Sequence, residues 1–166
     1  MNALCCLDGT NTEWLARQIF GLLNAHDLRL VLLYVIDSGP GQDMERMRQR
    51  YMGIGQRRAD LLAQATQAEQ EQAAELLAAA LEVFRAQWPG GPPDAAQIEA
   101  TSLRGRPEQE IVRLSASTPS DLIIIGNRRV RGPHEPPHPP GPKSVGHVAR
   151  FVVDHAPCPV LLLRPA

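Results

Sequence analysis

The sequence predicts an α/β fold: a doubly wound, five-stranded parallel sheet with helices on both faces. Residues 28–36 and 122–125 are almost entirely apolar, as is typical of strands that are covered on both faces. Short apolar runs of this kind alternate along the chain with stretches whose apolar residues recur at helical spacing. A parallel sheet explains the alternation, because each crossover between neighbouring parallel strands needs a connecting helix.

The five expected strands are short and mostly apolar. They lie at residues 3–7, 28–36, 96–101, 122–125 and 159–163. The third contains Ile98 as its only large apolar residue, so we expect it at a sheet edge. The alternation predicts the strand order 3-2-1-4-5 in one domain over residues 1–166. The expected core residues are Leu4, Val31, Leu33, Val35, Ile123, Ile125 and Leu162.

Four helices connect these strands. Asn11 or Thr12 can cap the first, whose apolar face is formed by Trp14, Leu15, Ile19, Leu22 and Leu23. The second runs from about Arg57 to Trp88, with Leu61, Leu62, Ala65, Leu76, Leu77, Ala80, Leu81 and Phe84 on one side. The third begins at Gly105-Arg106-Pro107, where proline favours a first turn. The fourth is expected from about Ser144, which serves as its N-cap, to Asp154.

Composition limits the classes of function. The formal net charge is −1 and aromatic residues make up 4% of the chain, which argues against a nucleic-acid partner. No apolar run approaches the length of a membrane span, and no signal sequence is recognised, so the expected location is the cytoplasm without membrane contact. Cys5, Cys6 and Cys158 do not form a disulfide framework or a C-x-x-C pair, and are expected as small buried side chains.

The C-terminal third of the chain combines a strand, a loop and a helix start. The strand ending at Gly126 leads into a loop, and Ser144 begins the following helix. Free backbone N–H groups and the helix dipole make such a position suitable for an anion. Ligands of parallel sheets bind at the carboxyl ends of the strands, where the winding reverses. The loops concerned follow Asp8, Val35 and Gly126.

These residues resemble the universal stress protein family over essentially the whole chain. The resembling segments are Cys6-Leu-Asp-Gly-Thr10, Leu33-Tyr-Val-Ile-Asp37, Gly105-Arg-Pro-Glu-Gln-Glu-Ile111, Asp121 to Gly126, and Ser144-Val145 through Arg164. The family fold is the adenine nucleotide alpha hydrolase-like sheet of order 3-2-1-4-5. The resemblance implies a stress-response or regulatory protein.

The resemblance also implies a nucleotide site for ATP, with Mg²⁺ when ATP is bound. Adenine would lie by Val35, the ribose by Asp8, and the phosphates by Gly126 and Ser144-Val145. Arg129 and Lys143 would add positive charge. The full set of implied cofactor-binding residues is Asp8, Val35, Gly126, Asn127, Arg128, Arg129, Lys143, Ser144 and Val145.

The chain departs from the family's Gly-x2-Gly-x9-Gly-Ser/Thr pattern. Arg129 and Lys143 replace its second and third glycines, and the span from Gly126 to Ser144 is four residues longer. Side chains there restrict backbone approach to a phosphate, yet Arg and Lys are themselves phosphate ligands. Residues 127–143 hold three Arg and one Lys against one Glu, a net charge of +3. Two interpretations stay open: a decayed site, or an anion site rebuilt from side chains.

Other motifs do not indicate enzymatic chemistry. His134-Glu-Pro-Pro-His138 has the letters of a zinc-protease motif, but its prolines exclude the helix that this motif needs. Residues 136–140 suit a polyproline II ligand or a stiff exposed loop. Asp8 has no nucleophile–base pair or second carboxylate near it in sequence, and its alternative role is to cap its own turn or the first helix. We therefore assign no catalytic or metal-binding residue and predict that the chain is not an enzyme.

Two classes of function remain. In the first, a bound nucleotide controls a regulatory protein. In the second, the same fold is a nucleotide-independent interaction module that contacts an unknown protein partner through its dimer surface or its Pro-rich loop. A homodimer is expected through the last strand, Pro159 to Leu163, because an apolar edge strand needs cover and the resembling family commonly pairs protomers there.

Overall fold

The computed structural model describes residues 1–37, 56–126 and 145–164, with side chains omitted at 56–62. Its centre is a five-stranded sheet of order β3-β2-β1-β4-β5, and all pairings are parallel. The strands are β1 (Asn2–Leu7), β2 (Arg29–Asp37), β3 (Ile98–Gly105), β4 (Leu122–Gly126) and β5 (Val160–Leu163). The predicted fold class and strand order are confirmed, and the third strand lies at an edge as expected.

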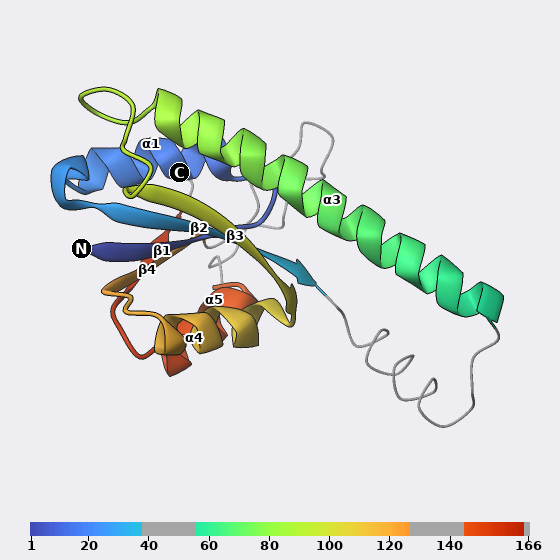
Figure 1. Ribbon diagram of the computed structural model, residues 1–166. Coiled ribbons are helices and arrows are strands. Elements are labelled where there is room, and N and C mark those ends of the chain that lie inside the picture. The colour runs from blue at the N-terminus through green and yellow to red at the C-terminus, as the bar shows by residue number, and fades with distance from the viewer. Residues whose placement is uncertain (38–55, 127–144, 165–166) are drawn as a thin grey trace, which may run out of the picture.

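Helices cover both faces of this sheet (Figure 1). On one face lie α1 (Thr12–Leu22) and α3 (Gln56–Ala86), and on the other lie α4 (Pro107–Ser117) and α5 (His147–His155). A short 3-10 helix, η1 (Ala25–Asp27), connects α1 to β2. The helices run back across the sheet, so α1, α3, α4 and α5 all begin at the edge formed by the carboxyl ends of the strands.

Each face of the sheet has its own hydrophobic core. All seven predicted core residues belong to the face under α4 and α5, where Leu4, Leu33, Ile123 and Ile125 are buried. The other three, Val31, Val35 and Leu162, are half-buried against the same cluster. The alternate strand residues, such as Leu32 and Ile124, are buried beneath α1 and α3. A strand that is buried on both sides shows no alternation between apolar and polar residues. The sequence pattern therefore did not reveal that the alternate strand residues form a second core on the other face of the sheet.

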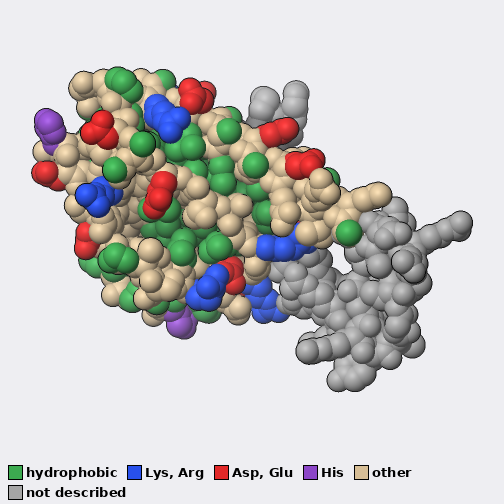
Figure 2. All heavy atoms as spheres, viewed as in Figure 1, with side chains coloured by type: hydrophobic (Ala, Val, Ile, Leu, Met, Phe, Trp, Pro, Cys, Tyr) green, Lys and Arg blue, Asp and Glu red, His purple; other side chains and the backbone are tan. Residues whose placement is uncertain are grey.

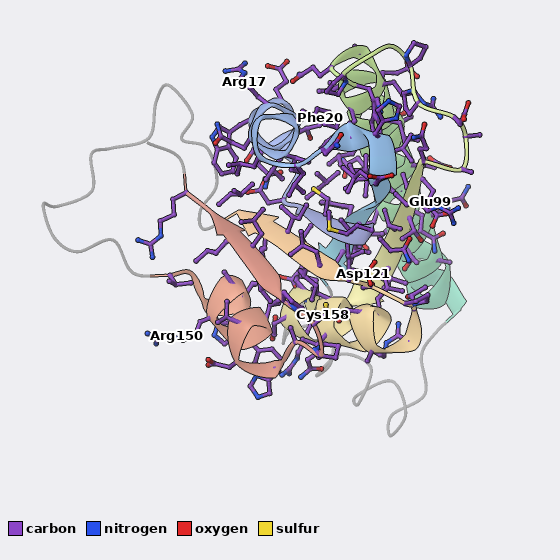
Figure 3. All side chains as sticks on the ribbon, turned by 90° about the vertical axis from the view of Figure 1, so that its left-hand side faces the viewer. Arg17, Phe20, Glu99, Asp121, Arg150 and Cys158 are labelled. Carbon is purple, nitrogen blue, oxygen red and sulfur yellow. The ribbon has the colours of Figure 1, made fainter. Side chains whose placement is uncertain are left out.

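The predicted apolar face of α1 is partly wrong. Leu15 and Ile19 are buried as expected, but Leu22 is 60% exposed. Phe20 points from α1 toward α3 instead (Figure 3), and its ring meets those of Phe84 at 5.9 Å and Trp88 at 5.1 Å. These edge-on aromatic contacts cover the flank of α1 that faces α3. Leu22, in the last turn, lies outside this contact.

The helix starts also differ in detail from the prediction. Pro107 begins α4 as expected. The last helix begins at His147 with Gly146 in the N-cap position, and not at Ser144, which lies outside the described residues. Gly146 has an extended ψ of 157°, and Val145 before it packs half-buried against the core. Because the backbone of Gly146 is extended, the helix begins only after it.

Candidate functional site

Three of the predicted site residues are brought together at the carboxyl edge of the sheet. β1 lies between β2 and β4, and Asp8 directly follows β1. The register pairs Leu7 with Tyr34, so Asp8 comes level with Val35. It also pairs Cys6 with Ile125, which places Leu7 level with Gly126. Since neighbouring strands lie about 4.8 Å apart, the ends of all three strands border one small area.

Asp8 is part of a tight hydrogen-bonded turn. One carboxylate oxygen, Oδ1, accepts hydrogen bonds from the backbone N–H of Thr10 (2.8 Å) and from its hydroxyl (3.0 Å). Gly9 between them has a φ of +87°, a conformation that L side chains rarely adopt. A Cβ there would also lie 3.2 Å from Leu76 Cδ1 of α3. The turn therefore fixes the half-buried Asp8 carboxylate at the edge of the sheet, which is compatible with both roles predicted for it.

Asn11 supports this turn from below. It occupies the N-cap position of α1, as one of the two predicted caps, but its side chain forms no capping hydrogen bond with the helix. The Asn11 side chain is buried, and its Oδ1 instead accepts the backbone N–H of Asp8 at 3.2 Å. A buried amide of this kind ties the end of β1 to the start of α1. The residue that sequence reasoning read as a helix cap thus positions the Asp8 turn.

The start of α5 provides the most favourable place for an anion. Its first turn contains no acidic residue, its N-cap is glycine, and its first residue is His147. The positive end of the helix dipole is therefore not neutralised by a carboxylate of the helix itself. Val145, just before it, packs against the same core cluster as Val35. A ligand lying across the ends of β2, β1 and β4 would meet this helix start.

Five predicted site residues lie outside the described residues: Asn127, Arg128, Arg129, Lys143 and Ser144. The His/Pro-rich motifs of residues 133–142 lie there too. Over the described part of one face, acidic and basic side chains are interspersed (Figure 2). Attraction of an anion must then come from local groups, such as the α5 start, and not from a broad field over that face.

The sequence analysis did not single out two ion pairs near this edge. Arg104, close to the end of β3, contacts Glu69 of α3, with Nη2 and Oε2 2.7 Å apart. His147 Nε2 of α5 lies 3.8 Å from Glu108 Oε1 of α4. Each pair joins residues that are far apart in sequence, so neither a motif nor a helical spacing could have identified it. Arg104 is one of several polar residues of β3, so its position near the end of the strand gave no separate signal.

The cysteines do not form a reactive or metal-binding group. Cys5 and Cys6 are buried in β1. Burial raises the pKa of the Cys5 thiol well above its usual value and that of Cys6 to about 12. Cys158 lies near Asp121 at the opposite, amino edge of the sheet (Figure 3), and its pKa is raised by desolvation and by that carboxylate. Within residues 1–37, 56–126 and 145–164, no group of His, Cys, Asp or Glu could hold a metal ion.

Asp121 itself has a structural role that the sequence did not reveal. Its Oδ2 accepts the backbone N–H of Asn2 at 2.7 Å, and its own N–H donates to the Asn2 carbonyl at 2.8 Å. This pair of bonds fixes the amino end of β4 beside that of β1. The register that brings Leu7 level with Gly126 is therefore also fixed at the far edge of the sheet.

The fold and the sequence place the chain in a known family. The family model described as the universal stress protein family matches residues 1–164, and the chain belongs to this family. A search of curated proteins found no significant match. Among the described helices, none has the length and apolar character needed to cross a membrane.

Solved structures share the fold at low sequence identity. Universal stress protein UspA from Lactobacillus plantarum is 21% identical, with 99% of this chain and 97% of that chain covered and a TM-score of 0.66. A universal stress protein family protein from Arabidopsis thaliana with AMP bound is 15% identical, with coverages of 100% and 92% and a TM-score of 0.58. A universal stress protein in complex with cAMP is 15% identical, with coverages of 99% and 96% and a TM-score of 0.56.

Proposed function

We propose that this universal stress protein is a regulatory protein that binds an adenine nucleotide at the carboxyl edge of its sheet. One observation carries the proposal: Asp8 just after β1, Val35 of β2 and Gly126 of β4 lie within one residue of the same level at the carboxyl edge, beside a helix start that has no acidic residue of its own in its first turn. A carboxylate suits ribose hydroxyls, an apolar side chain suits a base, and a helix N-terminus suits phosphate.

Two of the related structures support the class of ligand. One contains AMP and the other cAMP, and both share the fold of this chain. ATP with Mg²⁺ is the ligand that the sequence motif implied. The altered glycine positions, Arg129 and Lys143, favour charge–charge contacts over close backbone approach. We therefore expect binding that is more salt-sensitive than at a site with all three glycines.

We further propose that the protein acts in the cytoplasm by binding and not by catalysis. At the described part of the site, the Asp8 carboxylate is held in a turn, and the Glu108 carboxylate faces His147 at 3.8 Å. Hydrolysis would require a general base or nucleophile positioned by a second group. Nucleotide occupancy would then control which partner the protein contacts.

Calorimetric titration with AMP, and with ATP in the presence and absence of Mg²⁺, tests the proposal. We expect saturable binding that weakens as salt rises from 50 to 500 mM. Asp8→Asn keeps an oxygen for Thr10 but removes the charge, and should weaken AMP binding roughly tenfold, the value of one charged hydrogen bond. Thr10→Val is the matched control, because it removes a hydrogen bond to the same carboxylate while leaving the charge. Failure of all three titrations at millimolar nucleotide would favour the interaction-module alternative.

We also propose a homodimer through β5. This strand lies at a sheet edge, and Val160, Leu161 and Leu162 are only half-buried there. Val153 of the neighbouring helix α5 is 51% exposed, so the apolar surface continues beyond the strand. Light scattering at tens of micromolar should give twice the 18.2 kDa chain mass. Leu161→Lys should convert the protein to a monomer, whereas a monomer already formed by the unsubstituted protein would refute this interface.

A further inference from the structure

Helix α3 is held to the rest of the protein very unevenly along its length. It spans 31 residues, or about 46 Å, and its first turns project past the carboxyl ends of β2 and β3 (Figure 1). Among residues 63–86, for which side chains are described, the buried ones are Ala73, Leu77, Ala80 and Phe84. Hydrophobic packing therefore secures residues 73–86, and residues 63–72 depend on contacts of another kind.

Residues 63–72 of α3 carry no hydrophobic anchor. Only Thr66 and Glu69 in this segment are even half-buried, and Ala65, which the sequence pattern placed on the apolar face, is exposed. Alanine, glutamine and glutamate favour helix, and Gln67 donates a hydrogen bond from Nε2 to Glu71 Oε1 at 3.0 Å. These local effects keep the segment helical, but they do not determine where it lies relative to the sheet.

Arg104 provides a tertiary contact for this segment. Its Nη2 lies 2.7 Å from Glu69 Oε2, and the two side chains are only 21% and 36% exposed, respectively. Such partial burial reduces solvent screening relative to that of a surface ion pair. Glu69 lies seven residues before Leu76, which is two helical turns, so both residues are on the same side of α3. Leu76 in turn contacts the turn formed by Asp8 and Gly9.

We propose that Arg104 is a positioning residue that, through Glu69, holds the projecting part of α3 as one wall of the candidate nucleotide site. Leu76 packs on the turn that carries Asp8, and the Glu69–Arg104 pair extends this contact beyond the edge of the sheet. Without the pair, residues 63–72 fray from the sheet and the fraction of molecules with a complete site decreases. The second half of the proposal, the link to the ligand, rests on the proposed nucleotide function.

Amide hydrogen exchange tests the wall without any ligand. Glu69→Gln should speed exchange at residues 63–72 on the order of tenfold and leave residues 77–86 unchanged. Glu71→Gln is the matched control, since Glu71 is an exposed residue of the same segment. Glu69→Arg and Arg104→Glu should each speed exchange alone, and the double variant should recover most of the protection. Equal effects of Glu69→Gln and Glu71→Gln, or no recovery in the double variant, would overturn the proposal.

AMP titration of the same variants tests the link to the site. If the fraction of competent molecules decreases about fivefold, the apparent Kd of Glu69→Gln increases about fivefold. The charge-swapped double variant should return toward the original affinity, which a general loss of stability would not produce. Faster exchange with an unchanged Kd would overturn the role of α3 as a wall. Absence of AMP binding in the unsubstituted protein would instead refute the proposed function, while the exchange experiment would still decide whether the ion pair holds α3.

Discussion

Helices α4 and α5 begin side by side at the same edge of the sheet, but their first turns differ in charge. In α4, Pro107 is followed by Glu108 and Glu110, so carboxylates of the helix itself lie at its positive end. In α5, the first turn contains no acidic residue, and His147 follows the N-cap glycine. The start of α4 is therefore neutralised by carboxylates of its own helix, whereas the start of α5 faces a carboxylate of the neighbouring helix, Glu108, whose Oε1 lies 3.8 Å from His147 Nε2.

The side chains around the first turns of α4 and α5 also differ. Gly105, before α4, lies so close to Glu110 that a Cβ there would come within 2.7 Å of the Glu110 Cγ. The Glu110 carboxylate also accepts hydrogen bonds from Arg113 Nε and Nη2, so side chains of the chain itself fill the space at this start. The start of α5 offers instead a glycine and the half-buried Val145. The two starts thus differ in the charge of their own first turns and in the side chains that border them, and the proposed phosphate position lies at the start of α5.

The largest effect on stability is expected in the hydrophobic cluster that α4 and α5 share. Ile111 of α4 and Val152 of α5 are buried in the same cluster beneath the sheet. Ile111→Ala should lower the free energy of unfolding by about 2–5 kcal/mol, because it removes buried methyl groups and leaves a cavity. Urea unfolding measures this loss. Leu22→Ala, an apolar truncation at an exposed site, should cost less than about 1 kcal/mol, and a similar loss in both variants would contradict the packing described.

Sequence reasoning predicted most of the fold but only part of the site. The continuous apolar strand at 28–36 and the strand ending at Gly126 were recognisable because burial on both faces leaves an unbroken run of residues. The meeting of Asp8, Val35 and Gly126 followed from the strand order. The Glu69–Arg104 pair did not, because it depends on how far α3 projects beyond the sheet, which local pattern does not encode. The role of the Asn11 side chain was missed for a similar reason. Its position in the sequence indicates an N-cap, but its Oδ1 accepts a hydrogen bond from the backbone N–H of Asp8 and not from the helix.

The last prediction makes the start of α5 resemble that of α4. His147 is 78% exposed, and its Nε2 lies 3.8 Å from Glu108 Oε1, so His147→Glu places a second carboxylate beside that of Glu108 at the first residue of the helix. A negative charge beside the proposed phosphate position should weaken AMP binding by on the order of tenfold, or about 1.4 kcal/mol. His155→Glu makes the same change at the far, exposed end of α5 and should leave the AMP affinity unchanged, as measured by calorimetry at low salt. His147→Gln separates loss of the histidine from gain of the charge and should have the smaller effect. Equal weakening by His147→Glu and His155→Glu would show that the nucleotide responds to overall charge and not to the acid-free start of α5.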